Sequence, residues 1–280
     1  MLRPSLDLIK RALEEDGAEA DITTLSTVPE HQWAQGTLIA RPSGVIAGLP
    51  VAAETFRLLD HHVSVKLLVQ DGATVQPGEE LARLEGPARA ILSAERVALN
   101  FLGRLSGIAT LTSRCVRAVE GTGARILDTR KTTPGLRSLE KYAVQMGGGQ
   151  NHRFALNDGV LIKDNHIKAA GGIVQAVTAA RQMAPHLLKI EIECETLAEV
   201  QLALEAKADV VLLDNMDLET MRLAVESIRQ HAPHVLIEAS GSIGTNGDRL
   251  VAVAMTGVDF ISIGALTHSA PTFDISLEFA

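Results

Sequence analysis

The segment from Asp128 to Lys168 carries more positive charge than the rest of this acidic chain. It holds seven Lys and Arg residues against four carboxylates, although the 280-residue chain has a formal net charge of -8. The seven are Arg130, Lys131, Arg137, Lys141, Arg153, Lys163 and Lys168. A local surplus of cations attracts anions, and three successive glycines at 147–149 let the backbone approach a ligand closely. The pattern therefore indicates a site for phosphate or carboxylate chemistry.

Six short apolar segments follow Gly123 and would hold these charged side chains in place. Their centres lie near Leu127, Leu161, Ile190, Leu212, Ile237 and Ile261. The spacing of roughly 22–34 residues leaves room for one crossover helix between successive parallel strands. This alternation predicts an α/β protein whose second half is a parallel barrel or part of one.

A polar or small residue stands at the carboxyl end of each expected strand. In chain order these are Arg130, Lys163, Glu193, Asp214, Glu238 to Ser240, and Gly264. Strand ends can be polar simply because they meet solvent, but cations on the early strands and carboxylates on the later ones favour a divided site. Barrel enzymes build their active sites on this rim. Glu193 is preferred over Glu191, because strand alternation places both on one face and only Glu193 reaches the rim.

The first part of the chain has a different pattern. Apolar spacing predicts a helix from Leu6 to Leu13 that stops near Gly17, and residues 21–28 are expected to be extended. Between Gly36 and Leu84, short strands separated by turn signals, with a helix over 51–60, indicate a small mixed α+β domain.

A long helix is expected from Ala88 through Phe101, and the following segment either continues it or begins a second helix. Gly103 and Gly107 mark the expected break, with a domain boundary nearby. We therefore predict two domains. Residues 1–106 form an N-terminal mixed α+β sandwich, and residues 107–280 form an incomplete parallel α/β barrel. The prediction also allows the extreme C-terminus to pack against the first domain.

The amino-acid composition favours an α/β protein and argues against several other classes of protein. Hydrophobic residues make up 46% but aromatic residues only 3%, and this aliphatic excess suits parallel strands packed under helices. The acidic balance and the absence of an extended Lys/Arg tract argue against nucleic acid as a partner. Cys115 and Cys194 form no C-x-x-C pair, which argues against a disulfide framework or a thiolate zinc site. Without a signal-peptide core or a stretch of about 18 apolar residues, we expect a soluble cytoplasmic protein with no membrane partner.

Several motifs follow one another from Glu95 onward. They are DTRKTTPG at 128–135, GGGQNHR at 147–153, LIKDNH at 161–166, EIECE at 191–195, LLDN at 212–215, EASGSI at 238–243 and IGALTHS at 263–269. With these motifs the chain resembles the quinolinate phosphoribosyltransferase family. The resemblance implies a mixed α/β N-terminal domain followed by an incomplete α/β barrel. It also implies a Mg²⁺-dependent reaction of quinolinate with phosphoribosyl pyrophosphate that gives nicotinate mononucleotide for NAD synthesis and releases pyrophosphate and CO₂.

The resemblance assigns part of the site to quinolinate. Arg130, His152, Arg153 and Lys163 would line the quinolinate pocket. Planar guanidinium groups suit a pyridine dicarboxylate better than ammonium groups do. Arg96 would reach this pocket from the neighbouring subunit, which implies a homodimer and leaves a higher oligomer of dimers open.

A second group of residues would serve phosphoribosyl pyrophosphate. By resemblance, Lys131, Glu193 and Asp214 are the catalytic residues. Lys131 would lie at the phosphates, whereas the two carboxylates would hold the ribose hydroxyls and act on Mg²⁺ indirectly or through the substrate. The remaining substrate-binding positions are Thr129, Ser240, Gly241, Ser242, Ile263, Gly264 and Ala265.

Two positions depart from the family's pattern. Ser242 stands where the family has the second glycine of SGG, which leaves the detailed geometry of phosphate binding open. Ala155 replaces a glycine often found after NHR. Neither change removes a charged group.

Two other functions remain as alternatives. One is a paralogous phosphoribosyltransferase that acts on another aromatic acid, of the type associated with molybdate transport genes. The other is a non-catalytic barrel that binds a phosphorylated ligand. A simple binding protein would not need the complete set of acids and bases, which argues for an enzyme.

Overall fold

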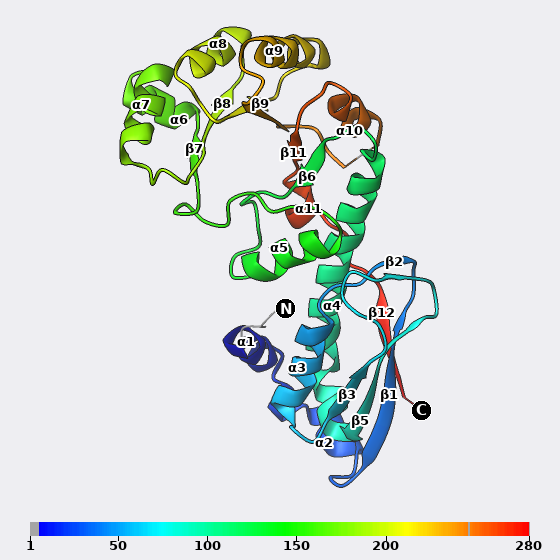
Figure 1. The fold of residues 1–280 in the computed structure, drawn as a ribbon. Helices are drawn as coiled ribbons and strands as arrows, with labels where there is room; N and C mark the ends of the chain where they lie inside the picture. The colour runs from blue at the N-terminus through cyan, green and yellow to red at the C-terminus, as the bar shows by residue number, and fades with distance from the viewer. Residues whose placement is uncertain (1–5, 246, 280) are drawn as a thin grey trace. The chain divides into compact units, whose positions relative to one another are not determined.

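The computed structural model describes residues 6–245 and 247–279 (Figure 1). These residues divide into two compact units. Unit 1 contains the described residues up to Ser113, the segment Thr132–Gly148 and the residues from Ser269 onward. Unit 2 contains Arg114–Lys131 and Gly149–His268. The predicted boundary between residues 106 and 107 falls inside a helix and stays a prediction.

Unit 1 is built on a four-stranded antiparallel sheet with the order β12-β1-β5-β3 (Figure 1). Its strands are β1 (Trp33–Ala40), β3 (Ser64–Leu67), β5 (Glu80–Pro87) and β12 (Ile275–Phe279), and a small second sheet pairs β2 (Gly44–Val45) with β4 (Thr74–Val75). The helices are α1 (Leu6–Asp16), η1 (Ala18–Ala20), α2 (Ile22–Thr27), α3 (Leu49–Leu59), α4 (Ala88–Ala118) and α5 (Arg137–Met146). α4 begins in unit 1, and its end from Arg114 belongs to unit 2.

Two expectations for unit 1 were wrong. Residues 22–27 form helix α2 instead of an extended stretch, because the Asp21 carboxylate accepts the Thr24 N–H at 3.1 Å and caps the helix. α4 continues through Gly103 and Gly107 without a break. A Cβ at Gly107 would lie 2.0 Å from the carbonyl oxygen of Pro271. This glycine therefore admits the C-terminal segment against the helix.

Unit 2 is a six-stranded parallel sheet with the order β6-β11-β10-β9-β8-β7. The strands are β6 (Arg125–Leu127), β7 (Val160–Ile162), β8 (Ile190–Cys194), β9 (Val210–Asp214), β10 (Leu236–Ser240) and β11 (Phe260–Ser262). All six predicted strands are present, and the predicted fold class is confirmed. β6 and β7 are the two edges of the sheet, so the barrel is incomplete compared with the eight strands of a closed one.

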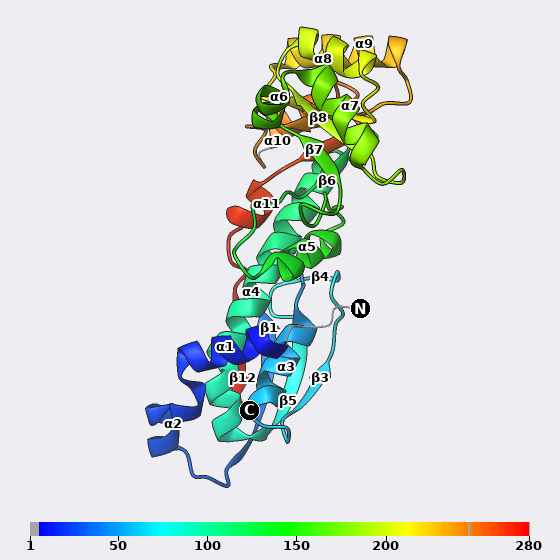
Figure 2. The same cartoon turned by 90° about the vertical axis from the view of Figure 1, so that its left-hand side faces the viewer.

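Helices cover the outer face of this parallel sheet (Figures 1 and 2). They are α6 (Asp164–Ala170), α7 (Ile173–Met183), α8 (Leu197–Glu205), α9 (Leu218–His231) and α10 (Gly247–Ala254), and the short α11 (Ala265–His268) follows the last strand. No helix in the described part of the chain is long and apolar enough to span a bilayer.

Alternation along the strands decides which side chains face the barrel interior. On β8, Ile190, Ile192 and Cys194 are fully buried, and the residues between them, Glu191 and Glu193, point to the opposite face. β10 repeats the pattern with apolar Ile237 and Ala239 on one face, and with Glu238 and Ser240 on the other. The sheet therefore lines its concave side with carboxylates, while aliphatic side chains pack on the other face.

Candidate functional site

A cavity of about 590 Å³ lies at the carboxyl ends of the unit 2 strands. Twelve of the fifteen predicted site residues line it: Thr129, Arg130, Lys131, His152, Arg153, Lys163, Glu193, Asp214, Ser240, Gly241, Ser242 and Gly264. Five further residues complete the lining: Leu161, Leu212, Asn215, Glu238 and Ser262. Segments far apart in the sequence thus meet at one rim, because all six strands run in the same direction.

Three predicted residues are not among those that line the cavity. Ile263 is buried, and its N–H donates to the Leu127 carbonyl at 3.0 Å, so it supports the strand end. Ala265 is the first residue of α11. Arg96 is exposed on the part of α4 that belongs to unit 1.

Arg130 and Arg153 form the cationic part of the cavity. Each has a buried Nε atom without a hydrogen-bond partner, and no carboxylate of the described residues pairs with either guanidinium. One Arg153 Nη donates to the Gly159 carbonyl at 2.9 Å, which fixes the side chain. Burial and the neighbouring Arg130 charge lower the pKa of Arg153, and Glu191 opposes this shift. Two neighbouring guanidinium groups without an ion-pair partner among the described residues favour an anionic ligand.

Carboxylates and a lysine form another part of the same cavity. The Lys163 ammonium donates to the Glu193 carboxylate. Asp214 accepts a hydrogen bond from the Asn215 amide at 2.7 Å. Asn215 itself takes the left-handed conformation with φ of 53°, one of two described non-glycine residues with positive φ. Its backbone bends immediately after the strand and turns its amide to the rim.

In the loop after β10, the backbone requires glycine at position 241 but not at position 242. Gly241 has φ of 103°, and a Cβ at this position would lie 2.4 Å from the Asn215 amide oxygen. Ser242 donates its N–H to the same oxygen at 3.2 Å and is not among the described residues with positive φ. Serine therefore fits this backbone without strain, and its hydroxyl is added to the cavity wall.

Backbone hydrogen bonds fix the position of Lys131, and a nearby glycine leaves room for its side chain. Its N–H donates to the Thr129 hydroxyl at 3.0 Å, and its carbonyl accepts from the Thr267 hydroxyl at 2.8 Å. A Cβ at Gly264 would lie 2.9 Å from the Lys131 side chain. The absence of a side chain at Gly264 thus gives the lysine stem room along the cavity wall.

Glu191 and Glu238 form a buried acid pair that was not among the predicted substrate-binding and catalytic residues, although Glu238 was one of the polar residues expected at the strand ends. Glu191 and Glu238 are 8% and 2% exposed. The His152 Nε2 atom lies 3.0 Å from a Glu191 oxygen and 3.7 Å from a Glu238 oxygen. Burial first, and then the charge of Glu191, raise the pKa of Glu238 to about 8. The available signal was the alternation that places both glutamates on the concave face of the sheet.

Replacing Glu238 by glutamine should flatten the pH dependence of folding stability. The folded chain keeps the Glu238 proton up to about pH 8, whereas an unperturbed glutamate loses it near pH 4.5. Because the folded state binds more protons in this window, the free energy of unfolding falls as pH rises through it. Urea unfolding at several pH values should show this fall in the wild type and a shallower one in Glu238→Gln. Equal slopes would contradict the assignment, and the exposed Glu226→Gln on α9 is the control.

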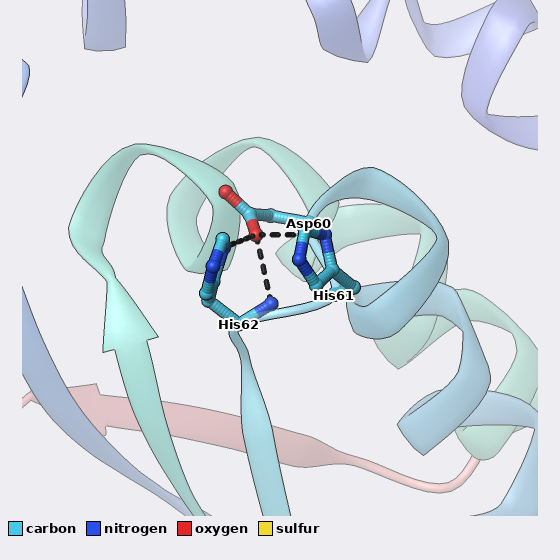
Figure 3. A group of neighbouring side chains, drawn as sticks. All are labelled: Asp60, His61 and His62. Atoms are coloured by element: carbon cyan, nitrogen blue, oxygen red, sulfur yellow. Dashed lines mark hydrogen bonds and ion pairs between the residues drawn. The ribbon is translucent and has the colours of Figure 1, made fainter.

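Among the residues that the structure describes, two groups of side chains have the composition of metal ligands. One is His152 with Glu191 and Glu238. The other is Asp60, His61 and His62, in the turn between α3 and β3 of unit 1 (Figure 3). There one Asp60 oxygen accepts a hydrogen bond from the backbone N–H of His62 at 2.8 Å, and the Nδ1 atom of the His62 ring lies 2.9 Å from the same oxygen. These hydrogen bonds lower the pKa of Asp60. They account for this group as a local turn motif.

Comparison with known proteins places the chain in a family. Residues 21–106 match the model of the quinolinate phosphoribosyl transferase N-terminal domain, and residues 108–278 match that of the C-terminal domain. The chain belongs to the quinolinate phosphoribosyltransferase family. It is 45% identical over 271 residues to the probable nicotinate-nucleotide pyrophosphorylase [carboxylating] of Bacillus subtilis, covering 97% of this chain and 92% of that protein.

Other relatives of this phosphoribosyltransferase agree over nearly the whole chain. The nicotinate-nucleotide pyrophosphorylase [carboxylating] of Mycobacterium leprae is 44% identical over 277 residues, which cover 97% of this chain and 96% of that protein. The crystal structure of nicotinate-nucleotide pyrophosphorylase from Ehrlichia chaffeensis superposes with a TM-score of 0.93 at 38% identity and covers both chains completely. The similarity therefore extends over the sequences of both units.

Proposed function

We propose that this chain is a quinolinate phosphoribosyltransferase of NAD biosynthesis. It transfers the phosphoribosyl group of phosphoribosyl pyrophosphate to quinolinate and releases pyrophosphate and CO₂, leaving nicotinate mononucleotide. The observation that carries this proposal is the pair Arg130 and Arg153, which face the cavity with unpartnered buried Nε atoms in a chain of this family. Such groups are costly to bury unless a ligand completes them.

Quinolinate would occupy the arginine part of the cavity. Its two carboxylates match two guanidinium forks, which bind planar anions in a bidentate manner. Lys163, which lines the same cavity, would add a third cation. The neutral pyridine nitrogen would then face the carboxylate part of the cavity, where the ribose is expected.

Phosphoribosyl pyrophosphate would lie between Lys131 and the loops after the last strands. Those loops contain Gly241 and Gly264, and loops at this position are the usual phosphate site of barrel enzymes. Glu193 and Asp214 would hold the ribose hydroxyls as hydrogen-bond acceptors. The added hydroxyl of Ser242 is a further donor for the phosphate.

Mg²⁺ fits the donors that this cavity provides. Magnesium is usually held by one or two carboxylates together with substrate phosphates, and Glu193 and Asp214 offer hard oxygen donors on neighbouring strands. When bound, the ion would neutralise the negative charge of the departing pyrophosphate. The ion pair of Lys163 with Glu193 leaves Asp214 as the more available carboxylate.

The reaction needs no protein nucleophile. As the bond between ribose C1 and pyrophosphate breaks, positive charge develops on the ribose, and the nearby carboxylates Glu193 and Asp214 stabilise it. The pyridine nitrogen donates its electron pair to C1. The bond to the 2-carboxylate then breaks and CO₂ leaves, while its electron pair stays on ring carbon C2 beside the positive nitrogen. This carbon takes a proton from water to give nicotinate mononucleotide. Lys131 and the glycine loops serve to orient the phosphates.

The chain should discriminate strongly between quinolinate and nicotinate. Nicotinate lacks the 2-carboxylate and would leave a guanidinium unpaired, which costs about 1.5–3 kcal/mol for each charge-assisted hydrogen bond lost. Steady-state kinetics with phosphoribosyl pyrophosphate should therefore give a kcat/KM for nicotinate at least about 100-fold lower. Comparable values for the two acids would reject the proposal. Faster turnover of another aromatic acid would favour the paralogous enzyme.

A further inference from the structure

The carboxylates Glu191 and Glu238 lie close to the arginine clamp without pairing with it. Glu238 and His152 line both the site cavity and a second cavity of about 560 Å³ toward the amino ends of the strands, whereas Glu191 lines only the second. Each glutamate has one buried oxygen without a hydrogen-bond partner, and Glu191 acts electrostatically on Arg153. Glu238 keeps its proton up to about pH 8, so Glu191 is the carboxylate that would ordinarily pair with Arg153. A further contact must hold Glu191 away from this guanidinium.

The His152 ring occupies the position that could do so. Its Nδ1 accepts the backbone N–H of Arg153 at 2.8 Å, so the ring proton must be on Nε2. That Nε2 faces the oxygens of Glu191 and Glu238. The backbone N–H of His152 donates to Asp128 at 2.9 Å, which anchors the residue at the end of β6. Because Nε2 carries the proton, the ring is set to donate to the acids and not to bind a metal ion.

We propose that His152 is a positioning residue that holds the Glu191 carboxylate away from Arg153, so that the guanidinium forks of Arg130 and Arg153 stay open for the substrate carboxylates. This inference rests on the proposed function. Without the imidazole donor, Glu191 would turn to Arg153, with which it already interacts electrostatically. An internal ion pair would then compete with quinolinate for the same guanidinium.

A rescue experiment distinguishes this role from a direct contact between His152 and quinolinate. His152→Ala should raise the KM and calorimetric Kd for quinolinate by roughly 10- to 100-fold, with a smaller change in kcat. Adding Glu191→Gln to this variant should restore most of the affinity, since a neutral amide does not compete for the arginine. His152→Gln, which keeps a donor, should be impaired less than His152→Ala. The exposed His234→Ala is the control.

Each outcome decides between the alternatives. A double variant as weak as His152→Ala, or a His152→Ala variant with normal affinity, would overturn the inference. If His152→Ala does not fold, His152→Gln with and without Glu191→Gln makes the same comparison. Failure of the wild type to turn over quinolinate would instead reject the proposed function, whereas wild-type turnover without rescue would reject only the role of His152.

Discussion

Arg130→Ala should lower kcat/KM for quinolinate by about 100- to 10,000-fold while leaving the fold intact. A guanidinium fork makes two charge-assisted hydrogen bonds to a carboxylate, each worth about 1.5–3 kcal/mol. Arg130 follows β6, its Nε is buried without a partner, and it makes no ion pair with a described carboxylate. Its removal therefore takes away a substrate contact without leaving a buried acid unpaired.

The arginine experiment needs kinetics together with a test of folding. Arg130→Lys should fall between the wild type and alanine, because lysine keeps the charge but loses the fork. Arg222→Ala, on the exposed face of α9 in the same unit, is the matched control and should retain full activity. Unchanged quinolinate turnover by a folded Arg130→Ala variant would remove this residue from the substrate site.

Two inactive variants should complement each other if Arg96 serves the neighbouring subunit. We propose that Arg96, exposed on α4, completes the site of a partner in a homodimer. Arg96→Ala and Arg130→Ala homodimers should both be nearly inactive toward quinolinate. Random pairing of the two chains makes half of the dimers mixed, and each mixed dimer has one intact site. Co-expression should therefore restore about a quarter of wild-type activity. This fraction treats every site that lacks an arginine as inactive, because each charge-assisted hydrogen bond lost costs about 1.5–3 kcal/mol.

The complementation experiment has an internal control. Arg130→Ala combined with Arg153→Ala should restore nothing, because both residues line the cavity of the same unit and no mixed dimer has a complete site. Differently tagged chains would verify that mixed dimers form. Full activity of Arg96→Ala alone, or no recovery in verified mixed dimers, would contradict the assignment of Arg96 to the neighbouring site.

The strands of unit 2 and their charged ends could be predicted because each strand has its own apolar run. Once strands are parallel, their carboxyl ends share one edge, and Lys163, Glu193 and Asp214 must lie on the same rim. The cavity brings these residues together. Their roles in binding and catalysis stay predictions, which the variants described above test.

The parts that could not be predicted depend on contacts between distant segments. Gly103 and Gly107 suggest a helix break by local propensity, but their missing side chains make room for the chain near Pro271 and Phe273. Likewise, strand alternation places Glu191 and Glu238 on the concave face, but only the folding of β8 and β10 brings them to His152. No local pattern shows that the three residues meet, since they are far apart in the chain.

Release of labelled CO₂ from quinolinate that carries radiocarbon in its 2-carboxylate tests the central claim most directly. We predict release that requires the wild-type chain, phosphoribosyl pyrophosphate and Mg²⁺ together, and that stops when a chelator removes the metal. Nicotinate mononucleotide should form in equal amount. No release from the folded wild-type chain with both substrates and Mg²⁺ in excess would contradict the account and favour a phosphoribosyltransferase for another aromatic acid.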